Sequence, residues 1–285
     1  MTAPAGPAAF VDLHMHSTAS DGSRSPSDVV RAAKQASLAA IALTDHDTVD
    51  GLEEARRVGD ELGIRVVNGV ELSAVEGDAE THLLGLHLRD TDVLARGLAE
   101  LREMRGRRAA HIVEKLQGLG VQVTMDDVML QAGVGAIGRP HVARALVADG
   151  WATDVRDAFD RYLGAGRPAY VAKDQLGMSD AIAMVHAAGG LAVLAHPAGA
   201  GTRERLEKLA ALGMDGVEVK HPSHSPSDTA RLRTLSEQLG LIASGGSDWH
   251  GAGDGPRTIG MMHVPAEWLA RQDEHLATLG RVPAA

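Results

Sequence analysis

The sequence predicts an α/β protein built on a parallel sheet, open or closed into a barrel, with a helical insertion in the middle. Strand-like and helix-like segments alternate in both the first and the last part of the chain, and this alternation is typical of parallel sheets. Between them the alternation stops, and four amphipathic segments follow one another. We therefore expect a sheet domain over residues 10–91 and 167–285 and a helical insertion over residues 92–166.

The first third of the chain begins with a strand and then a well-marked helix start. Serine caps a helix and proline fits its first turn, so Ser25 and Pro26 predict a helix that extends through Ser37. A second helix is expected near Val49–Gly63. The expected strands of this third are VDLHMHS (11–17), AAIALT (39–44), IRVVNGVELSAV (64–75) and ETHLLGLHL (80–88).

After the insertion the same alternation resumes. The expected helices are Ser179–Ala188, Arg203–Leu212 and Asp228–Leu239. The expected strands are LAVLAH (191–196), GVEVKH (216–221) and LIASGG (241–246). Each of these strands is a short apolar run, as buried strands are.

Composition excludes several classes of protein. The 285 residues include no cysteine, which rules out disulfides, thiolate zinc sites and a cysteine nucleophile. A net charge of −10 argues against a groove for long nucleic acid. No apolar run approaches the roughly 20 residues of a membrane span. Residues 1–9 lack the features of a secretion signal, so we expect a disordered leader and a cytoplasmic protein away from membranes. The oligomeric state stays open.

The stretch DLHMH (residues 12–16) places two histidines one residue apart at the end of an apolar run. Alternate side chains of a strand point to the same face, so His14 and His16 are expected to project together. Two converging imidazoles suit a metal ion better than they suit a core. An aspartate, Asp21, follows five residues after His16.

Further candidate ligands come at or near the ends of the other expected strands. They are His46, Glu71, His82, His196, Asp248 and His250. A single histidine is more often a surface or hydrogen-bonded residue, but the joint placement favours one shared site. A β/α barrel assembles its active site in this way, from residues that are far apart in the sequence.

Several motifs together resemble the PHP (polymerase and histidinol phosphatase) family. They are HMHSTASDG, LTDHDT, the stretch around Glu71, VLAHP and GSDWHG, in order over most of residues 10–260. The resemblance implies a distorted (β/α)7 barrel with a trinuclear metal centre. It implies three metal positions. The first is held by His14, His16, Glu71 and Asp248, and the second by Glu71, His82 and His196. The third is held by Asp21, His46 and His250.

The central segments GRPHVARAL, RPAYVAKD and HPSH are similar to the nucleotide-directed branch of this family. That branch includes nucleoside 3′,5′-bisphosphate phosphatases and 5′-to-3′ exoribonucleases. The resemblance therefore implies a small phosphorylated nucleotide or a short oligonucleotide as substrate. Asp21 stands where histidinol-phosphatase-type members tend to carry histidine, which favours the nucleotide branch. Lys220 stands where an aromatic or apolar residue is expected, which predicts a change in substrate stacking.

The ligand types agree with a phosphate-ester chemistry. Nitrogen and oxygen ligands without sulfur suit two to three divalent ions of Mn, Zn or Fe. Three such ions carry six positive charges against three carboxylates, and the surplus attracts phosphate. Clustered ions also lower the pKa of water and stabilise charge on phosphoryl oxygens. Glu71 and Asp248 are accordingly expected at the catalytic centre. Asp45 and Asp47 flank His46, and either they orient an imidazole or they are solvated acids.

Four residues are candidates for substrate contacts: Arg139, His141, Lys173 and His224. Arg139 and His141 bracket a proline that can start a helix, whose N-terminus can face an anion. Plain surface charges remain the alternative for Arg139 and Lys173. His224 is a candidate general acid for the leaving oxygen, and His221 competes with it for that role. We expect the insertion to cap the barrel mouth.

Three other interpretations are less favoured by the sequence. GVGAIG (133–138) matches a dinucleotide-binding pattern but follows a helical segment instead of a strand, so we set it aside. Histidinol phosphate phosphatase is the alternative enzyme, against which Asp21 and GRPH count. A non-catalytic PHP binding domain is the third possibility, against which the complete set of nine ligands counts.

Overall fold

The computed structural model describes residues 9–77, 79–132, 137–171, 176–251 and 256–280. The expected leader therefore lies, up to residue 8, outside the described residues. The chain divides into two compact units, which are described separately. One is formed by Met1–Ala95 with Leu176–Ala285, and the other by Arg96–Gln175. Among the helices described, none combines the length and the apolar character needed to cross a membrane.

The first unit is a barrel-shaped sheet of eight strands in the order β7-β6-β5-β4-β3-β2-β1-β8. The strands are β1 (Phe10–Asp12), β2 (Ala40–Leu43), β3 (Arg65–Glu76), β4 (Ala79–Leu86), β5 (Leu191–Leu194), β6 (Gly216–Lys220), β7 (Ile242–Gly245) and β8 (Val264–Pro265). The segment after β7 returns to the segment after β1, because Asp248 N–H donates to His14 O at 2.8 Å and His16 N–H donates to Trp249 O at 2.9 Å. The predicted distorted barrel is confirmed.

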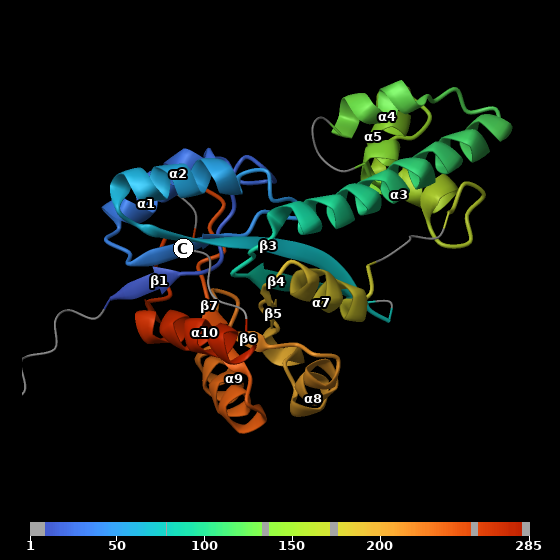
Figure 1. Ribbon diagram of the computed structural model, residues 1–285. Coiled ribbons are helices and arrows are strands. Elements are labelled where there is room, and N and C mark those ends of the chain that lie inside the picture. The colour runs from blue at the N-terminus through green and yellow to red at the C-terminus, as the bar shows by residue number, and fades with distance from the viewer. Residues whose placement is uncertain (1–8, 78, 133–136, 172–175, 252–255, 281–285) are drawn as a thin grey trace, which may run out of the picture. The chain divides into compact units, whose positions relative to one another are not determined.

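Helices cover the outside of this sheet (Figure 1). They are α1 (Pro26–Gln35), α2 (Leu52–Leu62), α7 (Met178–Ala187), α8 (Arg203–Ala211), α9 (Pro226–Leu239) and α10 (Ala266–Thr278), with a short 3₁₀ turn, η2 (Ala198–Ala200). Helix α1 begins as the sequence predicts, with Pro26 in its first turn and the Ser25 side chain accepting from Asp28 N–H. In Figure 1, α1 and α2 lie on one side of the sheet and α8, α9 and α10 on the other.

The sheet differs from the predicted all-parallel arrangement at β4 and β8. Strand β4 pairs antiparallel with both β3 and β5, and β8 pairs antiparallel with β1. The reason for β4 is a tight hairpin: Glu76 pairs with Ala79, and Gly77 takes a φ of +62° that glycine adopts easily. Because β4 runs backwards, its start lies at the same edge of the barrel as the end of β2. This reversal brings His82 to that edge.

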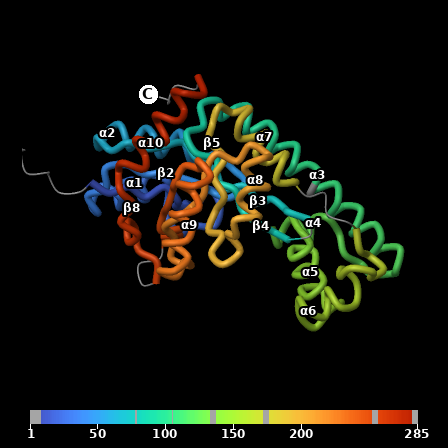
Figure 2. Tube along the Cα trace, turned by 90° about the horizontal axis from the view of Figure 1, so that it is seen from below, coloured from blue at the N-terminus to red at the C-terminus, as the bar shows by residue number. Residues whose placement is uncertain are grey.

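Among its described residues, the second unit has helices as its regular elements, joined by loops. Helix α3 (Thr91–Gly118) begins in the first unit, and α4 (Met125–Ala132), α5 (Arg139–Ala148), α6 (Val155–Ala158) and a π-helical turn, η1 (Phe159–Leu163), follow. Their small core includes Leu116, Val128, Leu146 and Leu163, all fully buried. Figure 2 shows α4, α5 and α6 grouped together.

Candidate metal centre

Two candidate ligands come from the segment just after β1. His14 and His16 are fully buried, and Met15 between them packs on the other side, in the core that includes Ile41 and Leu43 of β2. The alternation expected from the DLHMH stretch is therefore present. His46 follows β2, and a parallel bridge pairs it with Glu71 of β3.

Glu71 lies at the middle of the group and is 1% exposed. Five imidazole nitrogens lie within 2.8–3.3 Å of its carboxylate, from His82, His196, His14, His16 and His46. His14 Nε2 and His16 Nε2 also lie 3.2 Å apart, so at least one of them presents a lone pair instead of a proton. Both atoms lie beside Glu71 Oε2, and a lone pair that faces a carboxylate is not explained by a hydrogen bond. Cations among these groups would accept those lone pairs.

One cluster has the dimensions of a metal site. Its ligand atoms, from His14, His16, Glu71 and Asp248, all lie within 4.8 Å of one another. Five of the six separations are 3.1, 3.2, 3.2, 3.2 and 3.5 Å. In a tetrahedral zinc site, ligand atoms about 2.0–2.1 Å from the ion lie about 3.4 Å from each other. The donor set therefore fits a divalent ion of this size.

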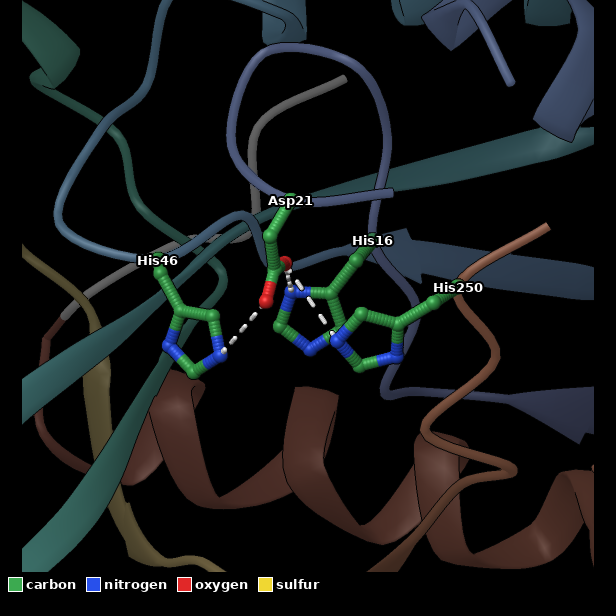
Figure 3. A group of neighbouring side chains, drawn as sticks. All are labelled: His16, Asp21, His46 and His250. Carbon is green, nitrogen blue, oxygen red and sulfur yellow. Dashed lines mark ion pairs between the residues drawn. The ribbon is translucent and has the colours of Figure 1, made fainter. Parts of the chain in front are cut away.

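A second cluster forms around Asp21 (Figure 3). One oxygen of Asp21 lies 3.3 Å from His250 Nε2 and 3.7 Å from His16 Nδ1, and the other lies 3.9 Å from His46 Nε2. His16 Nδ1 is buried and has no hydrogen-bond partner. A buried nitrogen without a hydrogen-bond partner, beside a carboxylate and two imidazoles, fits a metal ligand.

The loop that carries Asp21 is held in place by a carboxylate from the neighbouring strand end. Asp45 accepts from Ser17 N–H at 2.7 Å and from Ser20 Oγ–H at 2.6 Å. Asp47 accepts from Ser73 N–H at 2.9 Å. Asp45 was expected either to orient an imidazole or to be a solvated acid. Its described contacts favour neither role and indicate that it supports the loop instead.

The electrostatics are those of acids surrounded by imidazoles. Burial opposes the charge of Glu71 and Asp248, but the neighbouring histidines outweigh it and lower the pKa of both carboxyls. A hydrogen bond from His250 is the main reason that the pKa of Asp21 falls to about 2. Burial also opposes a charged His14, yet Glu71 and Glu218 outweigh it and raise the pKa of that imidazole.

Two of the candidate ligands have strained backbones. His196 and Asp248 have φ values of +28° and +51°, in the left-handed region that side chains other than glycine seldom adopt. Such strain persists only where surrounding contacts hold it, and it is common at functional sites. The second oxygen of Asp248 is held by Arg257, and His221 Nε2 lies 3.3 Å from it.

Sequence reasoning missed two of the residues that contact these candidate ligands, Glu218 and Arg257. Glu218 interrupts the apolar strand GVEVK with a charge, and this pattern was the available signal. Arg257 follows a glycine-rich segment without periodicity, so nothing in the sequence connects it with Asp248.

His224, one of the candidate substrate residues, contacts backbone groups through its ring. His224 Nδ1–H donates to Val219 O at 3.0 Å and His224 Nε2 accepts from Ala198 N–H at 3.1 Å. Both ring nitrogens are thus engaged by backbone groups, which argues against the expected role as general acid or substrate ligand.

The other candidates belong to the Arg96–Gln175 unit. The Arg139 guanidinium lies 5.7 Å from the Phe159 ring and 5.8 Å from the Tyr170 ring. His141 Nδ1 accepts from Gly138 N–H at 2.9 Å, at the start of α5. Lys173 and most of GVGAIG (residues 133–136) lie outside the described residues.

Comparison with known proteins identifies the family. The PHP domain matches residues 12–188. A 3′,5′-nucleoside bisphosphate phosphatase of Chromobacterium violaceum is 38% identical over 259 residues, which cover 88% of this chain and 91% of that protein. A 5′-3′ exoribonuclease of Haemophilus influenzae is 35% identical over 245 residues, with coverage of 84% and 89%.

A solved structure agrees with these matches. The crystal structure of a proposed metal-dependent phosphoesterase from Bifidobacterium adolescentis superimposes with a TM-score of 0.68 at 34% identity, covering 93% of this chain and 96% of that one. The barrel, the converging imidazoles and carboxylates and these similarities lead to one conclusion. The chain belongs to the PHP domain family of metal-dependent phosphoesterases.

Proposed function

We propose that this enzyme hydrolyses a phosphomonoester of a small nucleotide, namely the 3′-phosphate of nucleoside 3′,5′-bisphosphates. The observation that carries the proposal is the ring of five imidazoles around Glu71, which suits a multinuclear metal site. The nucleotide specificity is supported by the 38% identical bisphosphate phosphatase. We further propose two to three bound ions of Mn, Zn or Fe.

The proposed ligands are the nine residues that converge at the barrel edge. They are His14, His16, Asp21, His46, Glu71, His82, His196, Asp248 and His250. When bound, the ions lower the pKa of water and offset charge on the phosphoryl oxygens. Glu71 contributes both oxygens, one toward His82 and one toward His14, so it is the proposed bridge between two positions.

Substrate binding outside the cluster is proposed for the helical insertion. Arg139 and His141 lie at the N-terminus of α5, where backbone N–H groups and the helix dipole favour an anion. We assign them, with Lys173, to the phosphate that is not cleaved.

A second activity is favoured by the exoribonuclease of Haemophilus influenzae, which is 35% identical to this chain. Removal of nucleotides from a short 5′-phosphorylated RNA places a phosphodiester where the 3′-phosphate of a bisphosphate would lie. We therefore propose this activity as an accompaniment to the first.

The test is a substrate screen with protein loaded separately with Mn, Zn and Fe. Adenosine 3′,5′-bisphosphate should yield AMP and phosphate, and chromatography distinguishes AMP from adenosine 3′-phosphate. His196→Ala, which removes a ligand from the cluster, should abolish turnover while the fold persists. A strong preference for histidinol phosphate would refute the nucleotide assignment. Absence of hydrolysis for every ester would favour the non-catalytic alternative.

A further inference from the structure

Glu218 is a buried carboxylate to which the proposed function assigns no role. It lies in the middle of β6 and is 0% exposed. Its Oε1 lies 3.1 Å from His14 Nδ1, and its Oε2 accepts from the backbone N–H of His196 at 2.8 Å. A buried charge is costly unless its partners are well placed. Both oxygens of Glu218 are used on two candidate metal ligands.

The contact with His14 fixes the state of its imidazole. A carboxylate beside Nδ1 favours the form with the proton on Nδ1, which donates to Oε1. The lone pair is then on Nε2. Nε2 is the atom that lies 3.1 Å from Glu71 and 3.2 Å from His16, inside the first cluster. Glu218 therefore sets both the tautomer and the orientation that a metal ion requires.

The contact with His196 fixes a strained backbone. His196 has a φ of +28°, and Glu218 holds its N–H. This arrangement directs His196 Nε2 to within 2.9 Å of Glu71 Oε1. His14 approaches the other oxygen of Glu71. One carboxylate of β6 thus positions a ligand on each side of the central carboxylate.

Glu218 could instead be a ligand itself, since atoms of His14, Glu218 and His221 lie within 4.8 Å of one another. The hydrogen bonds of His221 argue against this. Its Nδ1 accepts from Ser223 N–H at 3.1 Å, so the proton is on Nε2, which lies 3.3 Å from Asp248 Oδ2. His221 is therefore directed toward Asp248 and has no lone pair for an ion beside Glu218.

We propose that Glu218 is a positioning residue of the metal centre, which acts through the His14 ring and the His196 backbone. The inference rests on the metal centre of the proposed function but not on its substrate. It is tested by metal binding, which requires no turnover.

The test variant is Glu218→Gln. The glutamine side chain has one acceptor, the amide oxygen, and one donor, the NH₂ group. If the amide oxygen accepts from His196 N–H, the NH₂ group must face His14 Nδ1. The NH₂ group then favours a proton on His14 Nε2, where the ion should bind. We expect the affinity of the ions held through His14 and His196 to fall about 10- to 100-fold. The ion in the cluster around Asp21 should be retained. Chelator competition followed by elemental analysis measures both.

The matched control is Asp215→Asn. Asp215 Oδ2 accepts from a backbone N–H, that of Ala192 at 2.7 Å, and lies 2.8 Å from His186 Nε2, while Oδ1 lies 3.7 Å from His275 Nε2. None of these residues belongs to the cluster, so this variant should bind metal like the wild type. The visible spectrum of Co²⁺-loaded protein gives a second readout, since it reports ligand geometry. Only Glu218→Gln should change it.

Thermal unfolding of the metal-free proteins separates positioning from damage to the fold. The proposal is overturned if Glu218→Gln binds every ion like the wild type, or if all ions are lost together with a lowered unfolding temperature. Should this variant not fold, Glu218→Asp decides, because its shorter side chain cannot reach both partners and should weaken the same ions. Wild-type affinity in that variant would also overturn the proposal. A wild type that binds no divalent ion would instead overturn the metal centre and the proposed function.

Discussion

Glu71 Oε2 and His14 Nε2 lie 3.1 Å apart although 57 residues separate them in the chain. The contact exists because β1 and β3 end at the same edge of the barrel, one on each side of β2. The other oxygen of Glu71 faces His82 and His196. A single carboxylate of β3 therefore connects groups from the segment after β1, from β4 and from the segment after β5.

Removing the charge of Glu71 should therefore disable the centre. We expect Glu71→Gln to lower kcat/KM at least about 100-fold, because the amide cannot offer an anionic oxygen to each side. The metal content should fall in parallel. Glu76→Gln on the same strand is the control, since Glu76 pairs with Arg205 of α8. An active Glu71→Gln enzyme with full metal content would contradict the bridging role.

Much of this site could be predicted from local patterns. The alternation in DLHMH placed His14 and His16 on one face, and polar residues after apolar runs indicated the edge where Glu71 and Asp248 lie. These signals depend only on strand periodicity and on the geometry common to β/α barrels. The reversed direction of β4 could also have been predicted, because Gly77 lies in a short turn between two strand-like runs.

The hydrogen bonds of Glu218 and His224 could not be predicted from local sequence patterns. Glu218 and His14 are 204 residues apart, and only closure of the barrel brings them together. The orientation of the His224 ring depends on the backbone of Val219 and Ala198, which sequence patterns do not specify. Long-range hydrogen bonds of this kind are a property of the folded loops.

Asp21 offers a test of the half-exposed cluster alone. Its carboxylate approaches His16, His46 and His250 but none of the other candidate ligands in the described contacts. Asp21→Asn should therefore remove about one ion per chain and leave those around Glu71 in place. Elemental analysis of dialysed protein measures this loss. Equal loss of every ion would show that the clusters do not bind independently.

His224 should prove structural. If it were the general acid, its removal would cost about 100-fold or more in kcat. Since both ring nitrogens contact backbone groups, we expect His224→Ala to retain kcat within about tenfold. Stability should fall by about 1–3 kcal/mol, because Ala198 N–H and Val219 O lose their partner. Denaturant unfolding and the pH profile of kcat measure the two effects. Loss of the alkaline limb in a folded variant would restore the catalytic role.

The pH dependence of stability should include a contribution from His87. This histidine is 4% exposed, and its Nε2 lies 2.9 Å from Gln272 Oε1. Burial is the main cause that lowers its pKa below the usual 6.5. As the pH falls below 6.5, the unfolded chain takes up this proton before the folded protein does. Stability therefore decreases toward the lowered pKa, by at most about 1.4 kcal/mol per pH unit.

The variant that isolates this contribution is His87→Asn. His87 has a φ of +58°, which asparagine tolerates better than most residues, and asparagine does not titrate in this range. The free energy of unfolding, measured by denaturant at several pH values, should decrease less steeply below pH 6.5 in the variant than in the wild type. Contributions from all other histidines cancel in the difference between the two curves. Parallel curves from pH 7.5 to 5 would mean that His87 takes up its proton equally in the folded and unfolded chains.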